Sequence, residues 1–138
     1  MSPANPLENL SRPGGSLKPE SPDAAEIAGL LRTGRARLVD AGNTALALES
    51  RFDVAYNAAH ALCLAALRAK GYRAGNRYIV FQVLPHTLGL GPEVWRVLDL
   101  CRNKRNLGEY EGLLEVDARL VGDLILAAQR VADALAAA

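Results

Sequence analysis

The chain of 138 residues has a mass of 14.7 kDa, which fits one domain and leaves no room for separate catalytic and regulatory modules. Hydrophobic residues make up 50% of the sequence and aromatic residues only 5%, so leucine, valine and alanine must build the core. This mixture favours helices and argues against an all-β sandwich. Sixteen basic and 15 acidic residues give a net charge of +1, which excludes a globally basic nucleic-acid binder but permits a local basic patch.

Residues 1–20 are rich in proline and glycine and contain few large apolar side chains. We expect them to form a flexible tail, followed by a single helical domain over residues 21–138, because such a segment cannot bury enough surface to offset its ordering entropy. The N-terminus lacks the features of a signal peptide, and no segment reaches the ~18 apolar residues of a membrane span. These observations predict a cytoplasmic protein that does not contact a membrane.

A first helix is expected to begin at Ser21-Pro22, with a serine cap and proline in the first position, and to end near Asp40. The strongest helical pattern runs from Thr44 or Ser50 to Lys70, and Gly71 is expected to cap its C-terminus. The alanine-rich face of this second helix favours close packing of another helix, either within the chain or across a dimer. That face contains Ala55, Ala58, Ala59, Ala65 and Ala66.

A short third helix is expected over Tyr78–Leu84, capped by Asn76 and ended or kinked by Pro85. A fourth helix begins at Gly91-Pro92-Glu93, and a fifth is expected over Leu113–Leu135. The predicted fold is therefore an all-α, antiparallel helical bundle of four long helices and a short one. The apolar face of the fourth helix is expected to contain Val94, Val97, Leu98 and Cys101.

The cysteines, Cys63 and Cys101, both lie within apolar helical patterns, with no CxxC motif and no histidine at metal-ligand spacing. We expect buried, reduced thiols, and neither a metal nor a cofactor.

Arg105 continues the helical period of Val94, Leu98 and Cys101, so it occupies a position where an ordinary amphipathic helix would have leucine. A guanidinium there must meet a carboxylate, a polar cleft or an anionic ligand. A structural alternative is an internal network in which Arg105 pairs with Glu109 or Asp53. The polar residues around Arg105 are Arg102, Lys104, Asn106, Glu109, Tyr110 and Glu111.

Asp53, Tyr56 and Asn57 would be polar neighbours of Arg105 if the start of the second helix abuts the fourth. Asp53 would then orient the guanidinium, or would instead complete a capping box with Ser50. His60 and His86 are the only histidines, and their spacing leaves their roles open.

A second group of basic residues lies on both sides of the end of the second helix, and two tyrosines lie between or next to its members in the sequence. The helix dipole accounts for cations at a helix C-terminus, and the alternative is a stacking and phosphate-contact surface for single-stranded RNA. Trp95 is expected to anchor the bundle or a dimer interface. The basic group contains Arg68, Lys70, Arg73 and Arg77, and the tyrosines are Tyr72 and Tyr78.

Two stretches carry a resemblance to a known family: Arg51–His60 with the following helix to Arg73, and Arg105-Asn106-Leu-Gly-Glu109-Tyr110. Through them the sequence resembles HEPN domains (higher eukaryote and prokaryote nucleotide-binding) over about residues 23–135. The resemblance implies an all-α bundle, commonly a homodimer, of the kind found in bacterial toxin–antitoxin and defence systems. Many members of that family cut RNA without a metal, using an arginine, a polar residue and then a histidine after four to six intervening residues.

Arg105 and Asn106 match the first two positions of the HEPN motif, but Tyr110 stands where a histidine could lie. Tyrosine has an ordinary pKa of about 10 and is a poor base at neutral pH, so the sequence supports binding more strongly than cutting. The expected function is RNA or nucleotide binding with weak or lost metal-independent ribonuclease activity.

The residues expected to form this site are Arg105, Asn106 and Tyr110 at its centre, with Arg102, Lys104, Glu109, Asp53 and Asn57 in ligand binding. The expected partners are a second copy of the chain, RNA or a nucleotide, and an antitoxin. The alternative is a non-catalytic, homodimeric helical module for protein interaction.

Overall fold

A computed structural model describes residues 5–76, 79–111 and 116–138, without the side chains of residues 108–111. The described chain is mainly helical, so the prediction of an all-α protein is confirmed at this level. Its one departure is a pair of three-residue strands. In chain order the elements are α1 (Pro6–Leu10), β1 (Leu17–Pro19), α2 (Ala24–Ala41), α3 (Leu48–Ala69), β2 (Tyr72–Ala74), α4 (Ile79–Gln82), α5 (Leu84–Thr87), α6 (Pro92–Glu111) and α7 (Ala118–Ala137).

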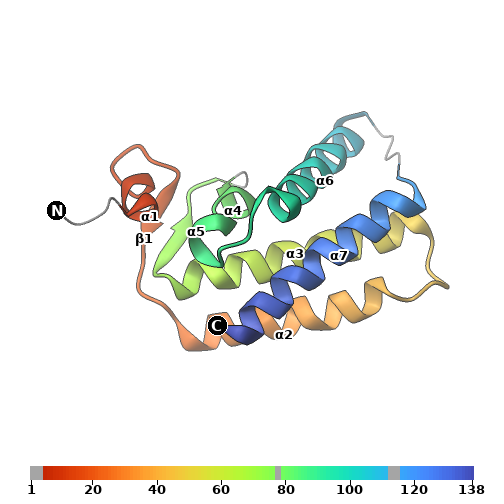
Figure 1. The fold of residues 1–138 in the computed structure, drawn as a ribbon. Coiled ribbons are helices and arrows are strands. Elements are labelled where there is room, and N and C mark those ends of the chain that lie inside the picture. The colour runs from red at the N-terminus through yellow and green to blue at the C-terminus, as the bar shows by residue number, and fades with distance from the viewer. Residues whose placement is uncertain (1–4, 77–78, 112–115) are drawn as a thin grey trace.

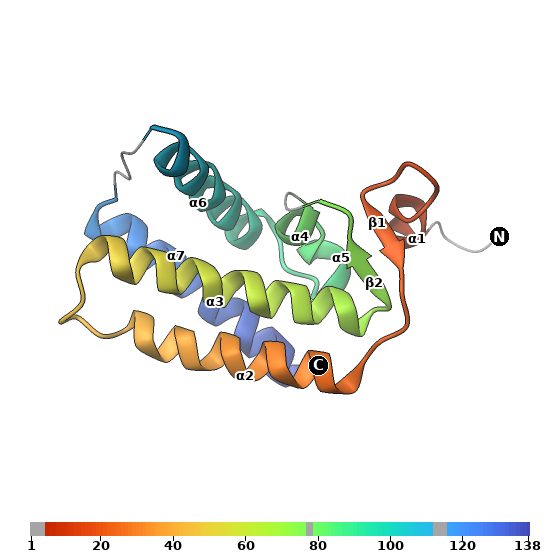
Figure 2. The same cartoon turned by 180° about the vertical axis from the view of Figure 1, so that it is seen from behind.

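Helix α3 lies at the centre of the fold, between α2 on one side and α6 on the other (Figures 1 and 2). Helix α7 packs along α3 and also contacts α2 and α6. The alanine-rich face of α3 is buried within the chain, which allows α2 to approach closely at Gly34, a buried position beside Leu62. The proposed use of that alanine face as a dimer contact is therefore wrong, because it is covered within the protomer.

The expected flexible tail is replaced by ordered structure in its described part. Strand β1 pairs antiparallel with β2, with Leu17 opposite Ala74. Leu7 and Leu17 are buried in a small second core, which also contains Leu67 from the end of α3. Two well-placed leucines and a strand partner thus order a segment whose average composition is that of a tail.

Three helix limits differ from those expected. Helix α2 begins after Asp23, not at Ser21-Pro22, because the Asp23 carboxylate accepts hydrogen bonds from the backbone N–H groups of Ala25 (2.9 Å) and Glu26 (3.1 Å). The predicted third helix is divided into α4 and α5, and Pro85 lies in the first turn of α5, where its missing N–H costs nothing. Helix α7 begins at Ala118 after an Asp117 cap, whereas the expected start at Leu113 falls outside the described residues.

Several other expectations hold. Gly71 follows the end of α3 with a positive φ of 88°, the conformation that favours glycine there. Asn76 caps α4 by accepting a hydrogen bond from the Ile79 N–H. Cys63 and Cys101 are buried thiols without a disulfide, and burial raises the pKa of both. Every helix of the described ranges is too short or too polar to span a bilayer.

Candidate functional site

The face of α3 that points toward α6 is polar along about two turns. Asp53, Asn57 and His60 follow one another at steps of four and three residues, and Tyr56 lies beside them, so all four belong to one side of the helix. Asp53 is exposed, Asn57 and His60 are half-buried, and Tyr56 is buried. Helix α3 thus presents a carboxylate, a phenol, an amide and an imidazole in a single row.

Helix α6 brings Arg105 onto this row. Val94, Leu98 and Cys101 are buried as predicted, and Arg105 extends their line by one further turn. The Arg105 guanidinium carbon lies 4.6 Å from the centre of the Tyr56 ring. Its Nη1 donates to Asn57 Oδ1 at 3.4 Å, and its Nε lies 3.5 Å from Asp53 Oδ1. We call Asp53, Tyr56, Asn57, His60 and Arg105 the Arg105 cluster.

Aromatic contacts with Phe81 orient the Tyr56 and His60 rings of the cluster. Phe81 of α4, which is fully buried, meets the Tyr56 ring edge to face at a centroid distance of 5.8 Å and the His60 ring at 6.1 Å. The Tyr56 and His60 rings are nearly parallel, 26° apart, with centroids separated by 6.5 Å. Such contacts hold flat side chains in defined planes. Arg105 therefore lies on a rigid aromatic support.

The contacts of Arg105 orient its side chain without burying it. The Arg105 side chain is 30% exposed and the Asp53 side chain 54% exposed, so their attraction is screened by water and contributes less than about 1 kcal/mol. The distances of 3.4 and 3.5 Å lie at the long end of polar contacts. Stacking on Tyr56 adds an attraction of about 1 kcal/mol. Together these contacts orient the Arg105 guanidinium, and the side chain remains partly exposed to solvent.

Asp53 contacts Arg105, as one of the two sequence-based alternatives requires. The other alternative, a capping box with Ser50, is wrong because α3 begins at Leu48, and both residues lie inside the helix. Ala47 occupies the cap position and makes no side-chain capping bond.

The remaining predicted residues are dispersed along α6. Arg102 is buried and bonds Asp99 Oδ1 through Nη2 (2.9 Å) and Nε (3.1 Å), so it lies inside the fold and not in the exposed part of the cluster. Lys104 lines a shallow pocket of about 220 Å³ with residues of α7. Asn106 is half-buried beside Arg105 in sequence. The side chains of Glu109, Tyr110 and Glu111 lie outside the described residues.

The second basic group is largely a structural network. Arg68 is 1% exposed, and its guanidinium bonds the carboxylate of Glu26 and the backbone oxygens of Glu20 (3.0 Å), Ser21 (2.8 Å) and Tyr72 (3.2 Å). This burial removes Arg68 from any RNA-contacting surface and fastens the segment before α2 to the end of α3.

Arg73 completes this network from β2. It bonds Glu20 Oε2 at 2.7 Å and Glu26 Oε2 at 2.9 Å. Hydrogen bonds donated by Arg73 lower the pKa of Glu20, and hydrogen bonds donated by Arg68 and Arg73 lower the pKa of Glu26. Donating to the two carboxylates raises the pKa of Arg73. Two cations therefore face two anions. Arg77 and Tyr78, the other members of that sequence pattern, lie outside the described residues.

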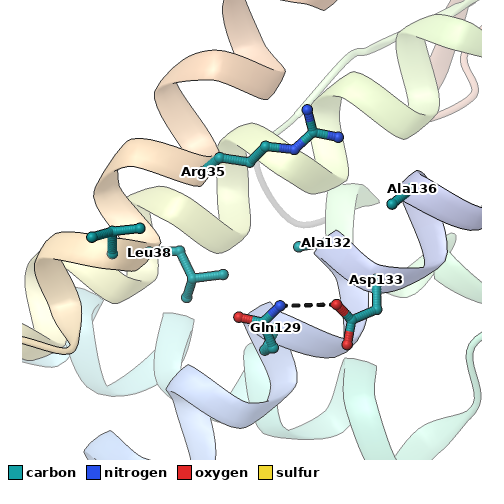
Figure 3. Close-up of a pocket in the computed structure, with 7 residues that line it drawn as sticks. Arg35, Leu38, Gln129, Ala132, Asp133 and Ala136 are labelled. Atoms are coloured by element: carbon teal, nitrogen blue, oxygen red, sulfur yellow. Dashed lines mark hydrogen bonds between the residues drawn. The ribbon is translucent and has the colours of Figure 1, made fainter.

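A pocket of about 320 Å³ between α2 and α7 contains none of the predicted site residues. Arg35 extends across it toward α7, Leu38 and Ala132 line its apolar part, and Gln129 donates a hydrogen bond to Asp133 at 2.9 Å (Figure 3). Helices α2 and α6 lie on opposite sides of α3 (Figures 1 and 2). Arg35 is thus an exposed arginine on a different face from Arg105.

His60 and Phe81 were not predicted from the sequence to belong to the site. The spacing of His60 from Asp53 and Asn57 could have placed it on their face, whereas nothing in the sequence indicates that Phe81 packs beneath them. Of the other aromatic and histidine residues, Trp95 is half-buried against the core with the Arg96 guanidinium 5.5 Å from its ring, and His86 is exposed on α5. Comparisons with models of protein families, with curated proteins and with solved structures found no match to this chain.

Proposed function

We propose that the Arg105 cluster binds a phosphate group of RNA or of a nucleotide, in a HEPN-like bundle formed mainly by α2, α3, α6 and α7. The observation that carries this proposal is the Arg105 side chain, which is 30% exposed and has its guanidinium stacked on the Tyr56 ring at 4.6 Å. The two stretches that resemble HEPN domains also meet at this point, since α3 supplies Asp53, Tyr56 and Asn57 and α6 supplies Arg105.

The chemistry of a stacked guanidinium suits a phosphate. Arginine presents its N–H groups in a planar fork that matches two phosphate oxygens, and the Arg105 side chain is 30% exposed. Asp53 and Asn57 limit rotation of the fork from the α3 side. A ligand that pairs with an already oriented arginine loses less side-chain entropy on binding than one that must order it.

Binding is supported more strongly than cleavage. Metal-independent cleavage requires groups that take a proton from the 2′-hydroxyl and return one to the leaving oxygen. The motif position expected to provide such a group holds Tyr110. We therefore propose that ribonuclease activity is weak or lost, and that a role in a toxin–antitoxin or defence system, with an antitoxin as partner, depends on binding.

The test compares Arg105 of α6 with Arg35 of α2, which lines the α2–α7 pocket. We expect Arg105→Ala to weaken binding of a short single-stranded RNA about tenfold, because a charge-assisted phosphate contact is lost. Arg35→Ala removes the same charge from the α2–α7 pocket and should leave the affinity nearly unchanged. Fluorescence anisotropy at two salt concentrations provides the affinities and the salt slope. Equal affinities for the wild type and Arg105→Ala would refute the proposal.

The second candidate function is a homodimeric module for protein interaction. It is favoured by Leu100 and Leu107, which are 49% and 54% exposed and lie seven residues apart on α6. Residues at that spacing share one helix face. If this function is correct, Leu100→Glu should dissociate the dimer in light scattering, and Arg105→Ala should reduce stability or dimerisation without altering RNA affinity.

A further inference from the structure

A pocket of about 280 Å³ opens beside the Arg105 cluster, and His60 belongs to both. Its apolar wall is formed by Leu64 of α3, Ala74 of β2 and Val80 of α4, and its polar groups come from His60, Arg73 and Asn76. We call it the His60 pocket. The Arg105 guanidinium lies against one end of the Tyr56–His60 pair, and the pocket lies at His60, the other member of that pair.

The charge of the His60 pocket argues against a phosphate as its occupant. Among the described residues that line it, Arg73 is the cationic side chain, and it is bonded to the carboxylates of Glu20 and Glu26 at 2.7 and 2.9 Å. Both carboxylates have a lowered pKa and are ionised at neutral pH. The positive charge is therefore compensated, and a neutral ligand with a polar edge fits the pocket better than a second anion.

The size and lining of the pocket fit one flat heterocycle. Its volume of about 280 Å³ lies just below the range of roughly 300–1,000 Å³ typical of sites for drug-sized ligands. A nucleobase combines apolar faces with a polar edge, and proteins that recognise single-stranded RNA stack bases on aromatic rings, including histidine. The His60 ring is already fixed in orientation by Tyr56 and Phe81.

We propose that the His60 pocket binds one base of a single-stranded RNA or nucleotide whose phosphate is held by Arg105. This inference rests on the proposed phosphate site and extends it from an anion site to a base-and-phosphate site. The Tyr56–His60 pair is then the link between the two subsites, since its rings are 6.5 Å apart and Arg105 lies 4.6 Å from the Tyr56 ring.

The test uses two oligomers of equal length and charge, a single-stranded RNA and an abasic ribose-phosphate chain. The wild type should bind the RNA about tenfold more tightly, because stacking of a base is lost in the abasic chain. Ala74→Leu and Leu64→Phe fill the pocket from two different elements, β2 and α3, and both should bind RNA only as tightly as they bind the abasic chain. Far-UV circular dichroism and melting temperature verify that each variant is folded.

Arg105→Ala separates this inference from the proposed function. It should weaken both oligomers while the preference for the base remains. If Arg105→Ala weakens both but the filled variants keep the preference for RNA, the pocket proposal alone is wrong. If the wild type binds neither oligomer, both proposals fail.

A measurement on the wild type avoids any dependence on the folding of the filled variants. The ring-proton resonances of His60 should shift when the RNA is added and should not shift with the abasic chain. The resonances of His86, which is exposed on α5, serve as the internal control. Unchanged His60 resonances at saturating RNA would overturn the pocket proposal.

Discussion

Gly34 tests how closely α2 and α3 pack. A Cβ added at Gly34 would lie 2.6 Å from Leu62 Cγ, 2.7 Å from Leu62 Cδ2 and 3.3 Å from the Ala58 carbonyl oxygen. Leu62 is fully buried, so its side chain has little room to move. We predict that Gly34→Ala destabilises the protein, although alanine is the better helix former.

The magnitude follows from two opposing terms. Replacing glycine by alanine inside a helix gains about 1 kcal/mol, and overpacking a buried contact costs about 1–3 kcal/mol. The expected net loss is about 1 kcal/mol, which lowers the melting temperature by about 3 °C in a domain of this size. Gly29 is the matched control on the same helix, because the nearest atom to its added Cβ is Arg32 Nη2 at 3.8 Å. Gly29→Ala should raise the melting temperature by about the same amount.

Calorimetry or thermal circular dichroism measures both variants, and a second background tests the named contact. Leu62→Ala removes the two carbon atoms that would collide with the new methyl group and leaves a cavity. In that background Gly34→Ala should become stabilising. A rise in melting temperature for Gly34→Ala in the wild-type background, equal to that of Gly29→Ala, would refute this account of the interface.

Three further predictions concern the charged network and the thiols. Glu20 and Glu26 have a pKa below 4.5 in the folded protein, so their contribution to stability is present above the unfolded-state pKa and is lost as the pH falls through the folded-state pKa. Urea unfolding measured from about pH 7 to about pH 3 should therefore show a falling free energy of unfolding. The fall should be smaller in Glu26→Gln, and an equal fall in both proteins would contradict the prediction. Arg68→Met should lower the melting temperature several times more than Arg105→Ala, because the Arg68 and Arg105 side chains are 1% and 30% exposed; equal losses would contradict the contrast. Burial raises the pKa of the Cys63 thiol, so Ellman's reagent at about pH 8 should modify it only in denaturant, and rapid labelling of the native protein would disprove this.

Helical periodicity was sufficient to predict that Arg105 of α6 faces α3, but not which other residues of α6 lie beside it. Val94, Leu98 and Cys101 are buried, and a position one turn further along the same line must meet the same neighbours. That local geometry predicts that Arg105 points inward. The identity of the support, Tyr56 on α3 with Phe81 beneath it, depends on how three helices are arranged and has no local signature.

The N-terminal segment shows where composition misleads. Residues 5–19 have the prolines and glycines of a linker, yet Leu7 and Leu17 are buried beside Leu67, and β1 pairs with β2 more than fifty residues away in sequence. Single leucines in such a segment produce no periodic pattern, and the partner strand is too short to be recognised by alternation. Only the tertiary contact distinguishes this segment from a disordered tail.

Arg68 and Arg105 differ in how far they are enclosed, and the sequence alone does not predict this difference. Both interrupt apolar helical faces, and both meet side chains from another element. Arg68 is enclosed by the Glu26 carboxylate of α2 and by the backbone oxygens of Glu20 and Ser21, so its charge holds the segment before α2 in place. Arg105 meets a ring, an amide and an exposed carboxylate at longer distances, and part of its surface remains open. We therefore interpret Arg68, which is 1% exposed, as structural, and Arg105, which is oriented by its contacts and 30% exposed, as the candidate for ligand binding.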